Sequence, residues 1–161
     1  MAAVLKDTIE PGALLVVDTS GILAYLDGTE RISGAAALVF DRLIATGRNS
    51  AVISAVSVTE ALVRPLRAQS TSATGTVEAY LRSFPNLSIE PVTYEIAREA
   101  ARIRAATALR TPDALILATA AVVGSPMVVA NDDRWLGAID RAGLAVGLCH
   151  LDAFQSSEIG T

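Results

Sequence analysis

The stretch "LLVVDTSGIL", residues 14–23, decides the fold of this chain. Four apolar residues, Leu14 to Val17, lead directly into Asp18, and the pattern after Gly21 is helical. A short apolar run that ends in polar residues and passes into a helix is typical of a buried strand in an α/β domain. A carboxylate at the end of such a strand is poorly placed for stability, because burying its charge costs free energy. We therefore interpret Asp18 as a candidate functional residue.

Strands and helices alternate along the rest of the chain. Further strands are predicted at 49–53, 87–92, 126–131 and 144–151, and helices at 20–27, 33–45, 54–68, 76–83, 94–108 and 111–124. Small polar residues at 70–75 predict a flexible loop, and Pro65 predicts a break or kink in its helix. The alternation predicts an α/β fold, a three-layer α/β/α sandwich around a mostly parallel sheet of about four to five strands.

Length and composition indicate one domain over residues 1–161 and give no sign of a nucleic-acid partner. The net charge is −4 and the pI is about 4.9. The single cysteine, Cys149, cannot form an internal disulfide, and we expect it in the core. No secretory signal is visible, and the longest apolar segment, 114–124, is too short to span a bilayer. We therefore expect a soluble, cytoplasmic protein with no membrane association.

Acidic residues stand where the predicted sheet would bind a ligand. In open α/β sheets, ligands bind beyond the carboxyl ends of the strands. Asp18 follows the first strand, Glu60 lies in the helix after the second, and Asp113 begins the helix that leads into the fourth. The run Asn131-Asp132-Asp133 follows the fourth strand. We predict that these acidic side chains share one edge of the sheet.

Carboxylates gathered at one edge repel one another unless a positive charge compensates them. A divalent cation supplies that charge. The one histidine, His150, is interpreted as a structural or surface residue, so the ligands would be oxygen atoms, which favours Mg²⁺ or Mn²⁺ over Zn²⁺. Carboxylate-held Mg²⁺ binds phosphate oxygens, an arrangement suited to metal-assisted cleavage of phosphodiesters.

Most of these acidic residues also have a structural interpretation. Glu60 could close a capping box that begins at Ser57. Asp113 could be stabilised by the dipole at a helix start. Asp132 or Asp133 could be turn residues. Asp18 has no such alternative, and it is the joint placement of the acids that favours a site.

Four segments carry a resemblance to a known family. They are "VVDTSGILAYL" (16–26), "ISAVSVTEAL" (53–62), "LRTPDALILATA" (109–120) and "VVANDDRWL" (128–136). In this order and spacing the chain resembles the PIN-domain ribonucleases, and most closely the VapC-type toxins of type II toxin–antitoxin systems. The resemblance covers nearly the whole chain, and its first and third segments are the most specific. It implies a PIN-like fold and endonucleolytic cleavage of RNA that depends on Mg²⁺ or Mn²⁺.

The resemblance also implies roles for individual residues. The catalytic, metal-binding residues would be Asp18, Glu60, Asp113 and Asp132, with Ser20, Asn131 and Asp133 in support. Asp18 and Asp113 would bind metal directly, while Glu60 and Asp132 would bind a second ion or orient water. The chain departs from the family at Ala130, where members commonly have a threonine or serine whose hydroxyl orients water or a carboxylate.

The implied partners are an RNA substrate, a second copy of the chain in a homodimer, and a VapB-type antitoxin that covers the acidic site. Arg64, Arg67 and Arg110 are candidates for holding RNA phosphates. One alternative is a PIN-like module with weakened catalysis that binds RNA or protein. Another is a haloacid-dehalogenase-type phosphatase, which is disfavoured because Ser20 stands where that chemistry needs a second aspartate.

Overall fold

The computed structural model describes residues 5–154. In this part of the chain five strands form one sheet: β1 (Leu14–Val17), β2 (Ser50–Ser54), β3 (Leu87–Glu90), β4 (Met127–Ala130) and β5 (Gly147–His150). Their order is β3-β2-β1-β4-β5, and every neighbouring pair is parallel. The α/β fold class and the predicted parallel sheet are confirmed.

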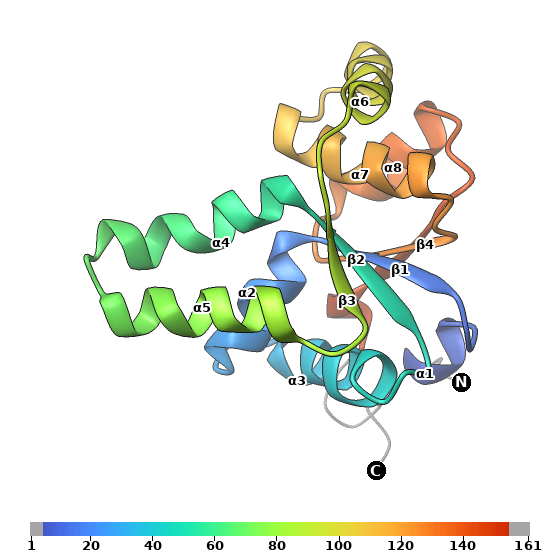
Figure 1. The fold of residues 1–161 in the computed structure, drawn as a ribbon. Coiled ribbons are helices and arrows are strands. Elements are labelled where there is room, and N and C mark those ends of the chain that lie inside the picture. Colours follow the sequence, from blue (N-terminus) through green and yellow to red (C-terminus); the bar gives the residue numbers. More distant parts are fainter. Residues whose placement is uncertain (1–4, 155–161) are drawn as a thin grey trace.

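Helices cover both faces of this sheet (Figure 1). They are α1 (Leu5–Thr8), α2 (Thr19–Asp27), α3 (Ser33–Ala37), η1 (Leu38–Ile44), α4 (Ala55–Arg67), α5 (Thr71–Ser83), α6 (Tyr94–Ala106), α7 (Thr111–Val123), α8 (Arg134–Arg141) and η2 (Leu151–Ala153). In Figure 1, α6, α7 and α8 lie on one side of the sheet and α3 on the other, while α4 and α5 project as a helical hairpin.

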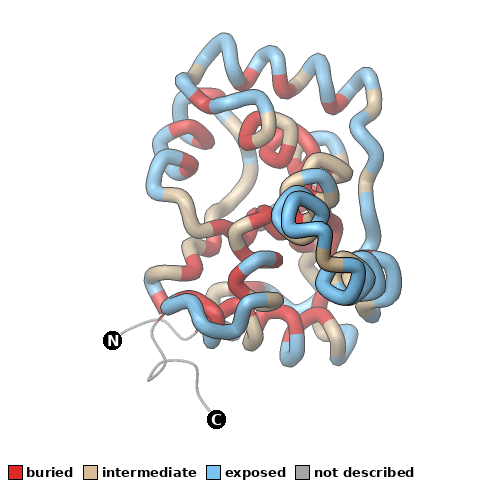
Figure 2. Tube along the Cα trace, turned by 90° about the vertical axis from the view of Figure 1, so that its left-hand side faces the viewer, coloured by how far each residue is buried: buried red, intermediate tan, exposed pale blue. Residues whose placement is uncertain are grey.

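Alternating side chains of the strands build a separate apolar core on each face of the sheet. Leu15 and Val17 of β1 face the core that contains α2, α3 and η1, whereas Val16 faces the core that contains α6, α7 and α8. This period of two follows from the strand geometry. Figure 2 shows the buried residues gathered toward the centre of the molecule. The strands are therefore fixed from both sides, and β1 is a rigid support for the residue that follows it.

Three local predictions need correction, and the helix after β4 was not predicted. The expected loop at 70–75 is wrong: α5 begins at Thr71, because the Ser70 hydroxyl accepts a hydrogen bond from the N–H of Ala73 (3.1 Å) and caps the helix. Pro65 does not end its helix, since α4 continues to Arg67. The predicted helix 33–45 is α-helical only to Ala37 and continues as a π-helix. Helix α8, which was not predicted, follows Asp133 directly.

Two further expectations can be compared with the structure. Cys149 is buried in the core, as predicted, and burial raises the pKa of its thiol to about 12. Across residues 5–154, no single helix is both long and apolar enough to span a membrane. Among the described residues, α6 and α7 are the only helix pair that reaches this length and apolarity when taken together, and the chain bends by 119° between them.

Candidate active site

Asp18 lies between β1 and α2, where the chain leaves the sheet. Its backbone N–H donates to the carbonyl of Val129 on neighbouring β4 (2.8 Å), which fixes its position. Its Oδ2 caps α2 by accepting hydrogen bonds from the backbone N–H (3.1 Å) and hydroxyl (2.6 Å) of Ser20. The expectation that Asp18 has no structural role is therefore wrong, because its side chain also caps a helix. The residue is only 7% exposed. Desolvation outweighs these hydrogen bonds, and with a smaller contribution from the charge of Asp113 it raises the pKa of Asp18 to about 6.

Ser20 and Asn131 connect Asp18 to the carboxyl ends of β4 and β5. The Ser20 hydroxyl oxygen accepts a hydrogen bond from the backbone N–H of Asn131 (3.1 Å). The Asn131 side-chain carbonyl in turn accepts one from the backbone N–H of Asp152 (3.0 Å). Both residues were predicted to support the site, and both hold its backbone together in this way.

Glu60 extends from α4 toward the start of α2. The hydroxyl of Thr19 lies 2.8 Å from Glu60 Oε1 and 2.9 Å from the hydroxyl of Ser57. The capping-box alternative for Glu60 is wrong, because α4 begins at Ala55 and is capped by Ser54. Glu60 is therefore a residue of the helix interior that is held by the neighbour of Asp18.

Asp113 lies in the first turn of α7, whose N-cap is Arg110. Asp113 is also only 7% exposed. Within residues 5–154, its Oδ2 is buried and has no hydrogen-bond partner. The guanidinium groups of Arg110 and Arg134 lie near this atom, at 3.5 Å and 3.6 Å. The helix dipole favours the charge of this carboxylate, but it does not provide a hydrogen bond to Oδ2.

Asp132 is held differently from the two buried aspartates. Two nitrogens of the Arg134 guanidinium donate to its carboxylate, with Nε 2.9 Å from Oδ1 and Nη2 2.5 Å from Oδ2. The backbone N–H of Arg134 also donates to Oδ1 (2.9 Å). These bonds keep the pKa of Asp132 below its ordinary value. Asp133 is exposed and contacts His150 instead, with its Oδ1 3.0 Å from Nε2.

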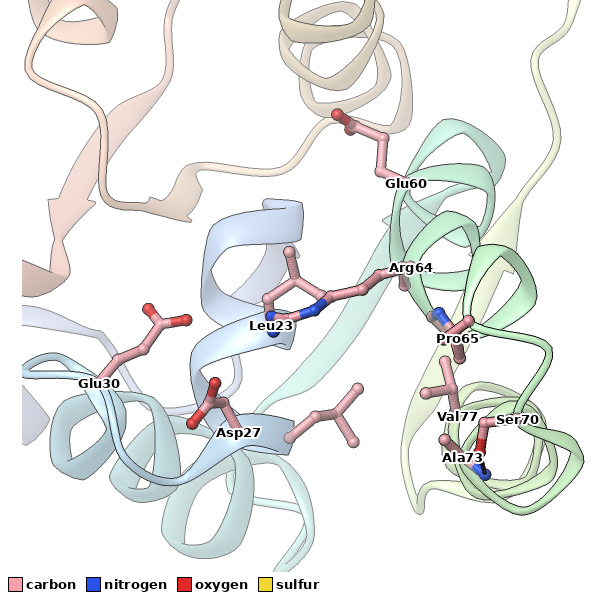
Figure 3. A pocket seen from close by; sticks show the side chains of 12 residues that line it. Leu23, Asp27, Glu30, Glu60, Arg64, Pro65, Ser70, Ala73 and Val77 are labelled. Carbon is pink, nitrogen blue, oxygen red and sulfur yellow. Dashed lines mark hydrogen bonds between the residues drawn. The ribbon is translucent and has the colours of Figure 1, made fainter.

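The predicted phosphate-binding arginines lie in different places. Arg110 is beside Asp113, whereas Arg67 is exposed in the last turn of α4. Arg64 borders a cavity of about 360 Å³ between α2, α4 and α5, which Glu60 also lines. Figure 3 shows Arg64 reaching from α4 toward Leu23 of α2.

Sequence reasoning missed Arg134 and Thr19, although both have a signal in the sequence. Arg134 stands two residues after Asp132, and Thr19 directly follows Asp18. An arginine beside several acids is a natural counter-charge, and a threonine hydroxyl next to a site residue is a natural hydrogen-bond donor.

The donor set fits a hard cation at Asp18 and Asp113. Both carboxylates are buried, one has its pKa raised, and the other has an orphaned oxygen. Oxygen ligands of this kind suit Mg²⁺ or Mn²⁺. In residues 5–154, however, no three side chains among the Asp, Glu, His and Cys residues are grouped closely enough to hold a metal ion. Asp132 is bound to Arg134, and Glu60 is bound to Thr19.

The fold of the protein is similar to that of several solved structures. One is VapC20 of Mycobacterium tuberculosis, a sarcin-ricin loop cleaving toxin, with 19% identity and a TM-score of 0.64 over 77% of this chain and 94% of that chain. FitAcB from Neisseria gonorrhoeae has 19% identity and a TM-score of 0.65, over 87% and 99% of the two chains. VapBC-5 of M. tuberculosis, a member of the VapBC family of toxin–antitoxin systems, has 27% identity and a TM-score of 0.58, over 86% and 98%.

A search of curated proteins gives no match. The sequence pattern of the PIN domain, by contrast, matches residues 15–142. This segment runs from β1, which supports Asp18, through α8, which carries Arg134, so it includes every acidic residue of the candidate site. The chain therefore belongs to the PIN-domain family.

Proposed function

We propose that this protein is a Mg²⁺- or Mn²⁺-dependent endoribonuclease, the toxin of a toxin–antitoxin pair. The observation that carries the proposal is the pair of buried carboxylates, Asp18 and Asp113, at the carboxyl edge of a PIN-domain sheet. An ionised carboxylate that is buried without a buried cation is costly for the fold. A site that binds a divalent cation explains why two of them are retained.

The residues of the site would divide the work between them. Asp18 and Asp113 would hold the ion, which would supply positive charge to the phosphodiester in the transition state and make a water molecule more acidic. Ser20 keeps Asp18 oriented through its two hydrogen bonds. Glu60 and Asp132 would orient water or hold a second ion. Arg110, next to Asp113, would bind a phosphate of the RNA backbone.

The partners and location are part of the same proposal. Several similar structures are toxin–antitoxin complexes, such as the VapBC2 complex from Rickettsia felis bound to promoter DNA. We propose a VapB-type antitoxin as partner of this chain, and a homodimer as its assembly. A cytoplasmic location follows from an RNA substrate, and one domain over residues 1–161 stays a prediction.

A second candidate function is a PIN-like module with weakened catalysis that binds RNA or protein. Two observations favour it. Ala130 at the end of β4 provides no hydroxyl, and Asp132 is neutralised by Arg134. The two functions differ in one measurable property, the cleavage of RNA in the presence of metal.

The test is cleavage of single-stranded RNA by the purified chain with Mn²⁺, with Mg²⁺ and with EDTA. We expect cleavage only with metal, and a loss of at least about 100-fold in Asp113→Asn, because even residues that merely support metal ligands cost 10–100-fold. Glu95→Gln is the matched control, since it removes one charge from an exposed position on α6. Activity that persists in EDTA or in Asp113→Asn contradicts the proposal. Absence of cleavage by the unmodified chain favours the binding module.

A further inference from the structure

Arg134 reaches into the acidic site, a position that the sequence pattern did not predict. Its guanidinium makes a bidentate pair with Asp132 and lies 3.6 Å from the orphaned Oδ2 of Asp113. One side chain thus contacts two of the four acids that the site contains. Bidentate pairs between arginine and a carboxylate are among the strongest charge-assisted hydrogen bonds. In this arrangement Arg134 supplies the positive charge that a divalent ion would otherwise supply.

The position of Arg134 allows its side chain to leave without disturbing the fold. The side chain is 56% exposed, whereas the next residue, Trp135, is fully buried and fixes the backbone at the start of α8. Asp132 would keep its orientation after such a movement, since the backbone N–H of Arg134 also binds Oδ1. Because solvent screens this exposed pair, its net contribution to stability is small despite its bidentate geometry. A more strongly bound cation can therefore displace the guanidinium.

We propose that Arg134 is an internal counter-ion that competes with the divalent cation for Asp132 and Asp113 and thereby sets the metal affinity of the site. This inference rests on the proposed function. In the metal-free protein Arg134 neutralises the charge of Asp132. Metal binding displaces the guanidinium from the carboxylates, so the ion must overcome this contact in addition to shedding its own water.

The experiment is a calorimetric titration of the full-length chain with Mn²⁺, in which the readout is the dissociation constant. Arg134→Gln removes the competing charge and keeps most of the side-chain length. We expect it to bind Mn²⁺ about fivefold more tightly, which corresponds to the ~1 kcal/mol of a well-formed exposed ion pair. Arg98→Gln is the matched control. It removes one positive charge from an exposed position on α6, and we expect a change below about twofold.

A double-mutant cycle separates direct competition from a general effect of charge. In an Asp132→Asn background, Arg134→Gln should improve Mn²⁺ affinity by less than about twofold, because the bidentate contact no longer exists. Arg134→Lys, which keeps the charge but not the fork, should lie between the original chain and Arg134→Gln, and it provides a second variant if Arg134→Gln folds poorly. Circular dichroism checks that each variant is folded.

The outcomes distinguish this inference from the function on which it rests. An unchanged dissociation constant in Arg134→Gln and Arg134→Lys overturns the role of Arg134, even if the unmodified chain binds Mn²⁺ and cleaves RNA. An equal gain with and without Asp132 also overturns it. Failure of the unmodified chain both to bind Mn²⁺ and to cleave RNA overturns the proposed function, and this inference with it.

Discussion

The acidic site has a buried half and an exposed half, and the two are stabilised in opposite ways. Asp18 and Asp113 are each 7% exposed. Within residues 5–154, Asp18 Oδ2 accepts hydrogen bonds from Ser20, whereas Asp113 Oδ2 has no hydrogen-bond partner. Asp132 is more accessible and is fully paired with Arg134. Burial penalises the charge of Asp18, whereas the guanidinium favours the charge of Asp132. In the buried half, the carboxylate charge therefore carries a free-energy cost that a cation can offset. In the exposed half, Arg134 already offsets it.

The strongest test of this difference compares Asp18→Asn with Asp132→Asn in metal-free protein at pH 7. Asparagine at 18 keeps an oxygen that can cap α2 but removes the buried charge. We expect Asp18→Asn to raise the free energy of unfolding by about 1–3 kcal/mol, from a pKa shift of about two units. Asp132→Asn should lower it by about 0–1 kcal/mol, as for an exposed ion pair. Urea denaturation measures both.

With Mn²⁺ present, the unmodified chain should be more stable than Asp18→Asn, which reverses the order expected without metal. The ion stabilises the unmodified chain by mass action, and it should stabilise Asp18→Asn much less. If Asp18→Asn is less stable than the unmodified chain in the absence of metal, the charge of Asp18 does not destabilise the fold. The proposed difference between the two halves is then wrong.

The second test is the pH dependence of metal binding and stability. The folded pKa of Asp18, about 6, lies above its ordinary value of 3.8, so between these pH values the folded protein binds more protons than the unfolded chain. The contribution of Asp18 to stability is therefore largest at low pH and decreases as the pH rises toward 6. Asp18→Asn should remove this decrease. Below pH 6, Mn²⁺ affinity should weaken by close to tenfold per pH unit, since the ion requires ionised Asp18.

Calorimetry from pH 5 to 7.5 measures this profile. Arg134→Gln should change the affinity at every pH but should leave the midpoint at about 6, because the titrating group is in the buried half. A midpoint near 4 would show that Asp18 does not control binding.

A smaller effect on metal binding is expected for Ser20→Ala, which removes a hydroxyl from the buried half. Ser20 donates to Asp18 Oδ2 and accepts from the N–H of Asn131, so its loss should destabilise the fold by about 1–2 kcal/mol. The hydrogen bond from Ser20 lowers the pKa of Asp18. Its removal should move the midpoint of Mn²⁺ binding to higher pH. Ser72→Ala on exposed α5 is the control, and an unchanged midpoint contradicts this role.

The sequence was sufficient for the sheet and for the positions of the two buried aspartates. Apolar runs mark the strands, and parallel strands bring the residues at their carboxyl ends to one edge of the sheet. The start of α5 was missed because serine, threonine and glycine resemble a loop when the capping role of Ser70 is not recognised. The pairing of Asp132 with Arg134 depends on the side-chain conformation at the start of α8, and Thr19 meets Glu60 across 41 positions. Such contacts arise from tertiary packing, which composition and periodicity do not report.

The hydrogen bond between Ser20 and Asn131 sets the stage of synthesis at which the acidic site can assemble. It joins residues 111 positions apart, and Asn131 is in turn held by the backbone of Asp152. At about 5–20 residues per second, a ribosome needs roughly 5–22 s to advance over that distance. The first strand is therefore made long before the segment that completes the site. A nascent chain of this protein therefore has no assembled acidic site until the segment through Asp152 has been made.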